Sequence, residues 1–287
     1  MNSPDRMQNL IEQAVGGQVS TVSPLSGGCI GQVYRVKMAD GRVFGVKYDD
    51  APGSQLALEG FMLRYLAQHS VLPVPEVLHA ENGLLVMTFL PGESRFNEAA
   101  QVHAAELLAA LHAVTAAQFG LEQDTLIGGL PQPNPQMVSW LDFFREARLL
   151  HMAQEGLRTN RLPRELYARL AKFAEHVDRW LLEPERPSLI HGDVWTTNVL
   201  AQNGQITGFV DPAIYFAHPE IELAFTTLFG TFGRPFFERY HEIRPIPPGF
   251  FEERRDIYNL YPLLVHVRLF GGSYVSSVDG ALRQYGY

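Results

Sequence analysis

The stretch 191–198 reads HGDVWTTN, and it places Asp193 two residues after His191 and Asn198 five residues after Asp193. Enzymes that transfer a phosphoryl group use this spacing, with the Asp as the base that accepts or orients the proton of the attacking hydroxyl and the Asn as a magnesium ligand. A second carboxylate, Asp211, follows the apolar run ITGFV, where such enzymes carry the Asp that bridges their metal ions. We therefore predict Asp193 as the catalytic base and Asn198 and Asp211 as ligands of Mg2+.

The sequence around these residues predicts a tight β-hairpin. The segments SLIHGD, VLAQ and QITGFVD read as strands, with AsnGly at 203–204 as a turn. Taken singly, an Asp before a turn is more often a cap or turn former, and Asn198 could simply satisfy loop backbone. The joint pattern favours chemistry, because the predicted hairpin frames both carboxylates at one end.

Composition limits the class of protein. The 287 residues, 46% of them hydrophobic, can bury a large core, and this length is typical of about two domains. The formal net charge of -8, with no run of Lys and Arg, argues against a nucleic-acid partner. The start MNSPDRMQNL lacks the apolar core of a signal peptide, and the apolar run GLLVMTFL is too short to cross a bilayer. We expect a cytoplasmic protein with no membrane partner.

Residues 1–90 have the pattern of a small sheet with two helices. A short helix is predicted over 5–15 and a second over 55–68. Between them, VSTVSPLSGG, GQVYRVKMAD and RVFGVKY alternate apolar and polar residues, with AspGly at 40–41 as a hairpin turn. The strand LLVMTFL completes this predicted antiparallel lobe.

The pattern becomes helical beyond ProGly at 91–92. Helices are predicted over 97–117, 138–155 and 163–181 before the hairpin, and over 219–230, 234–242 and 250–270 after it. The predicted fold class is α+β and bilobal. A small antiparallel-sheet N-lobe, residues 1–90, would bind nucleotide, and a larger, mainly helical C-lobe, residues 91–287, would carry catalysis and acceptor binding.

The N-lobe offers candidate phosphate ligands. Gly27, Gly28 and Gly31 lie between the first two predicted strands, where backbone N–H groups could approach phosphates, although the run does not match GxGxxG and glycines there are usually ordinary hairpin residues. Lys47 on the third strand could contact ATP phosphates, and Glu59 on the following helix could hold it in an ion pair. The alternatives are a surface lysine and a glutamate on a solvated face.

The end of the strand LLVMTFL is the expected hinge between the lobes. Backbone groups of Thr88, Phe89 and Leu90 could bind the edge of adenine, and Met87 could bound its pocket. A buried strand followed by a turn explains the same residues equally well.

These residues resemble a known family, the fructosamine (ketosamine) kinases of the aminoglycoside phosphotransferase-like and protein-kinase-like superfamily. The resemblance covers nearly the whole chain, from LSGGCIGQVYRV and VKY through LIHGDVWTTN to YNLYPLLVHVRLFGGSY. Its more specific parts are DPA in place of DFG after the second strand of the hairpin, and the residues Ile127, Gly128, Gln132, Asn134, Trp140, Phe143, Phe144, Arg148, Tyr258, Asn259, Tyr261 and His266.

The resemblance implies a bilobal protein-kinase-like fold and an activity that depends on ATP and Mg2+. The expected reaction is phosphorylation of a sugar hydroxyl of a ketosamine, the 3-hydroxyl in the family's known cases, which gives an unstable ester that frees the amine. The acceptor would be a small ketosamine, such as a fructosamine, ribulosamine or erythrulosamine, or a glycated lysine, so the biological sense would be deglycation.

Departures from the family pattern concentrate around the acceptor. Members often read HGDLWSGN here, with an Asp-type carboxylate where Glu222 stands and Asn where Arg268 stands. Candidate acceptor contacts are Trp195, His218, Glu222, His266 and Arg268. Each also has a structural explanation: Trp195 could pack beneath the loop, the histidines could be core residues and Arg268 a helix-surface residue.

Cys29 is the one cysteine, so the chain has no internal disulfide. It lies in the glycine-rich loop at the family's cysteine position, where a thiol near backbone donors could oxidise. We expect a monomer, or a dimer linked through Cys29 whose oxidation switches activity off; an inert small side chain is the alternative.

Three other functions are compatible with parts of the sequence. The same fold could serve an aminoglycoside, choline or homoserine kinase, although the IGGLPQPNP and YNLY segments favour a ketosamine. A nucleotide-binding regulatory pseudokinase is disfavoured because Lys47, Asp193, Asn198 and Asp211 are all present. A hydrolytic metal centre at His191 and Asp193 would need further ligands that the sequence does not indicate.

Overall fold

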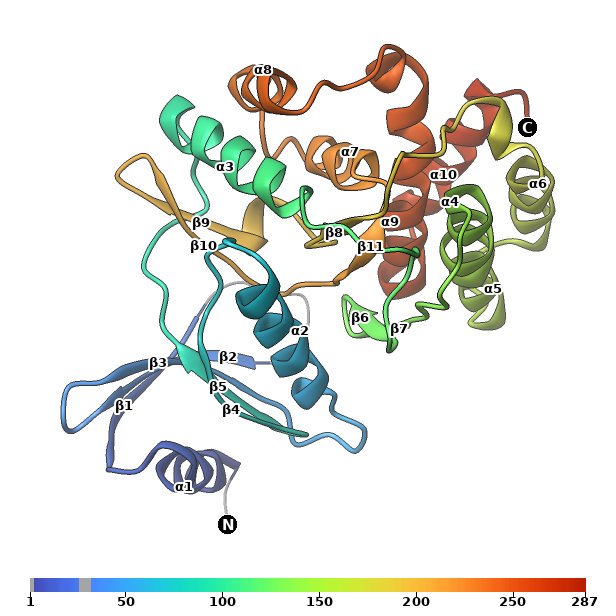
Figure 1. Ribbon diagram of the computed structural model, residues 1–287. Helices are drawn as coiled ribbons and strands as arrows, with labels where there is room; N and C mark the ends of the chain where they lie inside the picture. The colour runs from blue at the N-terminus through green and yellow to red at the C-terminus, as the bar shows by residue number, and fades with distance from the viewer. Residues whose placement is uncertain (1–2, 26–31) are drawn as a thin grey trace.

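In the computed structural model, which describes residues 3–25 and 32–287, an antiparallel sheet is followed by a larger helical part (Figure 1). The sheet part contains α1 (Ser3–Val15), β1 (Val19–Pro24), β2 (Gln32–Met38), β3 (Val43–Tyr48), α2 (Leu56–His69), β4 (Val77–Glu81) and β5 (Leu84–Thr88). Its strands lie in the order β1-β2-β3-β5-β4, and all neighbours are antiparallel. The predicted sheet and helices are present, and β4 is an addition that the prolines before it obscured.

The two helices of this part cover opposite faces of the sheet. Val46 of β3 packs with Ile11 of α1, whereas Leu85 of β5 packs with Leu63 of α2. Lys47 follows Val46 and is paired in register with Leu85. Because side chains alternate along a strand, Lys47 is directed toward α2, the helix that carries Glu59.

The helical part begins with α3 (Glu98–Leu111). A long continuous helix follows, made of α4 (Trp140–Phe143), the π-helical turns η1 (Phe144–Leu150) and α5 (His151–Arg158). The later α-helices are α6 (Arg164–Ala174), α7 (Glu220–Leu228), α8 (Arg234–Ile243), α9 (Arg255–Phe270) and α10 (Ser273–Gln284), and the π-helical turns η4 (Phe250–Arg254) lead into α9. The predicted helices are found; those predicted over 97–117, 163–181 and 219–230 are shorter than expected, whereas the one predicted over 138–155 extends to Arg158. The C-terminal helix α10 was not predicted.

The strands of the helical part correct the predicted hairpin. Only β9 (Val199–Gln202) and β10 (Gln205–Phe209) form it. Residues 191–198, which hold Asp193, are called the catalytic loop below. The strand before it, β8 (Ser188–Ile190), pairs instead with β11 (Tyr215–Ala217), which lies beyond Asp211. Two more short strands, β6 (Thr125–Ile127) and β7 (Leu130–Gln132), form a hairpin that the sequence analysis left unassigned. The loop that holds Asp193 is therefore anchored by strands far apart in sequence.

Helix α2 lies where the sheet part meets the helical part (Figure 1). Leu56 and Leu63 belong to the cluster on the sheet, whereas Met62 and Leu66 belong to the large core of the helical part. That core also contains Leu126 of the β6–β7 hairpin. One helix thus joins both hydrophobic cores.

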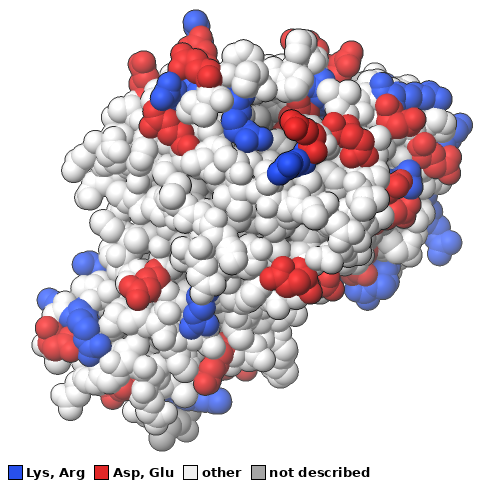
Figure 2. Space-filling view, viewed as in Figure 1, with Lys and Arg blue, Asp and Glu red and all other residues white. Residues whose placement is uncertain are grey.

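Charged side chains are interspersed on the surface. On the face shown in Figure 2, acidic and basic groups lie next to one another along the edges, and a broad central area carries neither. In the part of the chain that the structure describes, no helix is both long and apolar enough to cross a membrane.

Candidate active site

The loop between β8 and β9 holds Asp193 in a fixed geometry. The amide Nδ2 of Asn198 donates to the backbone oxygen of Asp193 at 3.0 Å and to its carboxylate Oδ2 at 2.9 Å. Oδ1 of Asn198 accepts one long hydrogen bond, of 3.4 Å from Thr197 Oγ1, and has a second lone pair for a metal ion. Gly192 precedes Asp193 with φ +85°, and a Cβ at this glycine would lie 2.1 Å from the oxygen of Ala213. Only glycine fits this close approach.

Lys47, Glu59 and Asp211 form a buried ionic cluster beside this loop. The Lys47 Nζ lies 2.7 Å from Glu59 Oε1 and 2.6 Å from Asp211 Oδ1, and the side chain of Lys47 is 4% exposed. Burial alone would lower the pKa of Lys47, but the charges of Asp211 and Glu59 raise it. The lysine therefore stays a cation. The predicted pairing of Lys47 with Glu59 is present, and the additional contact with Asp211 was not foreseen.

Asp193 and Asp211 both border one cleft and influence each other electrostatically. Burial, together with the charge of Asp211, raises the pKa of Asp193 well above its usual range. Asp211 has a left-handed backbone with φ +56°, a conformation rare outside glycine and common at functional sites. Oxygen ligands such as the Asp211 carboxylate and Asn198 Oδ1 suit Mg2+, which binds through one or two carboxylates plus phosphate oxygens and water. The residues present therefore fit this ion.

A cleft opens onto these groups from three segments of the chain. One wall is residues 49–62, which include the start of α2; the second is Leu126 with Gly128 and Gly129 of the β6–β7 turn; the third is the catalytic loop with Trp195 and Pro212. Among the described residues that line the cleft, four are carboxylates and one, Lys47, is a cation. The hairpin wall had no assigned role in the sequence analysis, although its IGG run was singled out.

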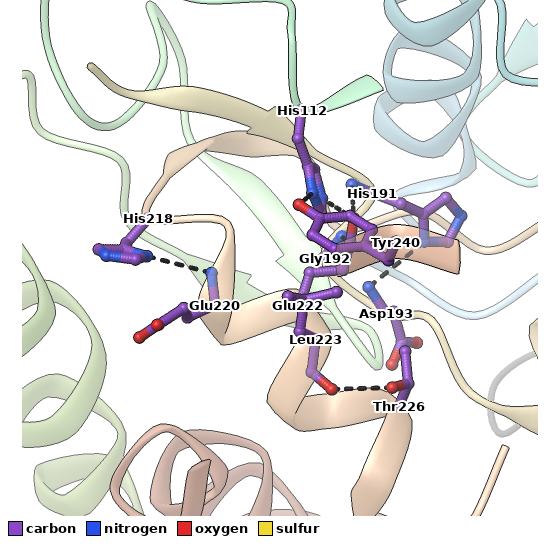
Figure 3. Close-up of polar contacts among 10 residues, drawn as sticks. All are labelled: His112, His191, Gly192, Asp193, His218, Glu220, Glu222, Leu223, Thr226 and Tyr240. Atoms are coloured by element: carbon purple, nitrogen blue, oxygen red, sulfur yellow. Dashed lines mark hydrogen bonds and ion pairs between the residues drawn. The ribbon is translucent and has the colours of Figure 1, made fainter. Parts of the chain in front are cut away.

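Glu222 lies behind the catalytic loop and not in the cleft (Figure 3). Its fully buried carboxylate accepts from the N–H of Gly192 at 2.6 Å and of His191 at 3.3 Å, and lies 2.9 Å from His112 Nε2. The other ring nitrogen of His112 lies 2.7 Å from the hydroxyl of Tyr240. The prediction that Glu222 contacts the acceptor is wrong, because its oxygens are occupied by the loop backbone and by His112.

His218 is likewise a core residue. It is buried between Trp140 and Tyr258, and its Nδ1 accepts from the backbone N–H of Glu220 at 3.1 Å. Burial lowers the pKa of His218 to about 3, so the ring is neutral. Glu220 itself forms a buried ion pair with Arg254 at 2.6 Å. The predicted acceptor contact of His218 is therefore wrong as well.

The other predicted acceptor residues lie along an aromatic row. Trp195 borders the cleft and packs against Phe229, with ring centroids 5.4 Å apart, and Phe229 packs against His266 at 5.1 Å. His266 Nδ1 contacts the oxygen of Pro262 at 2.7 Å, which leaves Nε2 for another partner. Arg268 lies 3.8 Å from Glu155 and does not border the cleft.

The predicted adenine residues lie at the end of β5 and just after it. The N–H of Thr88 donates to the oxygen of Glu76 at 2.9 Å, so it is already bound within the sheet part. The guanidinium carbon of Arg35 lies 5.0 Å from the centroid of the Phe89 ring, and Leu90 packs close to Gly208. The predicted phosphate residues Gly27, Gly28, Cys29 and Gly31 lie outside the described residues.

The sequence profile of the family described as fructosamine kinase matches residues 4–285. A probable ketoamine kinase of Synechocystis is 35% identical over 297 residues, covering 99% of this chain and 98% of the relative. The crystal structure of a putative fructosamine-3-kinase from Thermobifida fusca superposes with a TM-score of 0.84 at 31% identity, covering 99% of both chains. An aminoglycoside phosphotransferase solved with AMP-PNP and hygromycin B has a TM-score of 0.70 at 20% identity, covers 97% of this chain and 98% of its own, and shares the fold. The predicted bilobal kinase-like fold class is confirmed.

Proposed function

This chain belongs to the fructosamine kinase family, and we propose that it transfers the γ-phosphoryl group of ATP to a sugar hydroxyl, the 3-hydroxyl, of a ketosamine. One observation supports this most directly: the carboxylate of Asp193 is held by Asn198 at the edge of a cleft that also contains the ion pair of Lys47 and Glu59. A base, an oxygen ligand and a phosphate-binding cation thus converge on one cleft. Use of ATP follows from the family.

Each group has a defined task in the proposed reaction. Asp193 would accept the proton of the sugar hydroxyl as its oxygen bonds to the γ-phosphorus, and the bond from phosphorus to the β–γ bridging oxygen would break to release ADP. Lys47 would contact the phosphates after leaving Asp211. Asp211 and Asn198 would hold Mg2+, which supplies neutralisation of phosphate charge. Free Asp211 repels the charge on Asp193, so placing a cation at Asp211 would also favour the ionised base.

The acceptor would enter between the β6–β7 turn and Trp195. A ketosamine presents hydroxyls and a protonated secondary amine, and the excess of carboxylates over cations in the cleft favours such a cation. The ring of Trp195 would stack on the sugar, and His266, farther along the aromatic row, would lie toward the amine-bearing part, which could be a glycated lysine. Arg268, which does not border the cleft, would be reached only by a longer acceptor. Adenine would lie against Met87, with backbone groups of Phe89 and Leu90 as its partners.

The proposal also covers the organisation of the chain. Residues 1–90 would act as the nucleotide lobe, completed by Gly27, Gly28 and Gly31, and residues 91–287 as the catalytic and acceptor lobe. Two chains would be linked by a disulfide between their Cys29 thiols when an oxidant removes two electrons and two protons. Under reducing conditions the protein would stay a monomer. Dependence on ATP favours a cytoplasmic location.

The test is ATP consumption with Mg2+ over a panel of fructosyl-, ribulosyl- and erythrulosyl-amines, an aminoglycoside, choline and no acceptor. We expect turnover on the ketosamines alone and formation of the 3-phosphate. The Asp193→Asn variant should lose transfer and keep nucleotide affinity, because loss of the base affects chemistry more than ground-state binding. Turnover confined to another acceptor would overturn the substrate assignment, and nucleotide binding without any turnover would point to a regulatory protein.

A further inference from the structure

A buried polar network joins the β6–β7 hairpin to the segment that follows Asp211. Gln132 at the end of β7 is 1% exposed. Its Nε2 donates to the oxygen of Ala213 at 3.1 Å and to Thr125 Oγ1 at 2.8 Å, and its Oε1 accepts from the hydroxyl of Tyr261 at 2.7 Å. Thr125 donates in turn to the oxygen of Ile214 at 3.2 Å. The hairpin is therefore bonded to the segment that follows Asp211.

The far side of this network is anchored by a buried cation. Arg148 is fully buried in the π-helical turns, donates to the oxygen of Pro133 at 2.7 Å and to Asn134 Oδ1 at 2.6 Å, and lies 3.8 Å above the ring of Tyr215. Asn134 donates to Thr125 Oγ1 at 2.8 Å. Among the residues that the structure describes, Arg148 meets carbonyl and amide oxygens and aromatic faces and no carboxylate, so these groups stabilise its charge.

Such an arrangement is costly to build and hard to deform. The terminal nitrogens of Arg148 are bonded to oxygens while its Nε makes no hydrogen bond, so loss of a further oxygen would leave a second desolvated donor. The hairpin is therefore held in one position by Arg148 and Asn134. Helices with π-turns are frequent at functional sites, and here the turns carry the anchoring cation.

The segment after Asp211 is also bonded from its other side. The N–H of Ala213 donates to the oxygen of His191 at 2.7 Å, and the oxygen of Ala213 lies so close to Gly192 that a Cβ there would be 2.1 Å away. That same oxygen accepts from Gln132. Ala213 is thus the point at which the hairpin and the catalytic loop meet, two residues from the carboxylate proposed to hold the metal.

We propose that Gln132 is a positioning residue for the metal site. Through Ala213 it fixes the backbone that sets Asp211 against Asp193, and through β7 it fixes the turn that forms the acceptor wall of the cleft. The proposal rests on the proposed function for one point only, the assignment of Asp211 as a metal ligand. A purely structural role for Gln132 predicts a different result in the experiment below.

The test replaces Gln132 by Met, which keeps the length of the side chain and removes its donor and acceptor. Binding of a non-hydrolysable ATP analogue is followed by titration calorimetry across a range of Mg2+ concentrations, and without Mg2+. We expect the Mg2+ concentration that half-restores tight binding to rise about 10-fold, the lower end of the effect of residues that orient metal ligands. Binding without Mg2+ should be unchanged.

Matched variants separate positioning from stability. Tyr258→Phe removes a buried hydrogen bond of 3.1 Å to Trp140 in the same part of the molecule, and should lower the melting temperature without moving the Mg2+ midpoint. Tyr261→Phe removes one bond to Gln132 and leaves its donors; we expect a shift of about threefold in the same direction. This milder variant decides the question if Gln132→Met does not fold.

Asp211→Asn reports on the proposed function separately. If it binds Mg2+ and nucleotide as the wild type does, the assignment of the metal ligand fails. If Asp211→Asn loses the Mg2+ effect but Gln132→Met and Tyr261→Phe keep the wild-type midpoint within twofold, the positioning role fails and the proposed function stands. An equal shift in Tyr258→Phe would also overturn the positioning role, because general destabilisation would then explain it.

Discussion

Replacing Glu222 by Gln tests whether the carboxylate behind the catalytic loop positions Asp193. The two oxygens accept from Gly192, His191 and His112, so an amide must turn one NH2 group toward at least one donor. Each hydrogen bond to a charged group contributes about 1.5–3 kcal/mol, and leaving a buried donor unpaired costs about as much. We therefore expect the free energy of unfolding to fall by about 3 kcal/mol. For a chain of this size that lowers the melting temperature by roughly 6 °C. The loop would move by a fraction of an ångström, and kcat should fall about 10-fold or more, because a 1 Å misplacement costs about 100-fold.

The assay pairs steady-state kinetics on a ketosamine with thermal unfolding, both at a temperature where every variant is folded. Glu220→Gln is the matched control, because Glu220 lies on the same turn of α7, is equally buried and bonds Arg254 instead of the loop. It should lose similar stability, since breaking a buried ion pair is costly, yet keep kcat within twofold. The positioning argument is refuted if Glu222→Gln turns over like the wild type, or if both variants lose kcat equally.

Three further outcomes follow from contacts of single residues. Glu59→Gln should weaken nucleotide binding about 10-fold, because Lys47 keeps its other carboxylate but loses the partner that orients it; unchanged affinity in a calorimetric titration would contradict this. Gly192→Ala should abolish turnover, because its Cβ would collide with the oxygen of Ala213, and activity near wild type would show that the loop can yield. Burial raises the pKa of Glu222, but its hydrogen bonds and the neighbouring histidines lower it more, to below its usual 4.5. A carboxyl with a lowered pKa in the folded state stabilises the fold above about pH 4.5. That contribution is lost as pH falls through the lowered pKa. Urea unfolding of wild type and Glu222→Gln should therefore differ most near neutral pH and converge in acid; a difference independent of pH would contradict the sign.

The parts of the site that are close together in sequence were predictable. Asp193 and Asn198 lie five residues apart, and one short loop forces the amide onto the carboxylate. The period of two along β3 places Lys47 on one face of the sheet, but its pairing with Glu59 was predicted only beside the alternative of a surface lysine and a solvated glutamate. The hairpin of β9 and β10 was likewise set by its AsnGly turn.

Long-range pairings were not predictable from one sequence. The strand β8 pairs with β11, and Asp211 lies between the two in the sequence. Strands of three residues have too short an alternation of apolar and polar residues to indicate which strand is their partner. Glu222 was assigned to the acceptor because it departs from the family pattern, and His218 because it lies near that departure and could bond sugar hydroxyls. Whether such a residue faces ligand or backbone depends on the register of α7 against the loop, which is a tertiary property. Glu220 and Glu222 both lie in the first turn of α7, and the sequence does not indicate that one bonds Arg254 and the other the loop backbone.

The ionic cluster at Lys47 depends on hydrophobic packing as much as on charge. A buried ion pair gains little net stability, since desolvation offsets most of the attraction between the charges. Glu59 must therefore be brought to Lys47 by something else, and α2 provides it. Leu63 fixes the helix to the sheet, and Met62 fixes it to the core shared with the helical part. Because burying side chains of this size contributes about 1.5–3 kcal/mol each, two such contacts outweigh the cost of holding the charges together. The lysine and its glutamate are consequently aligned by the same packing that joins the two parts of the molecule.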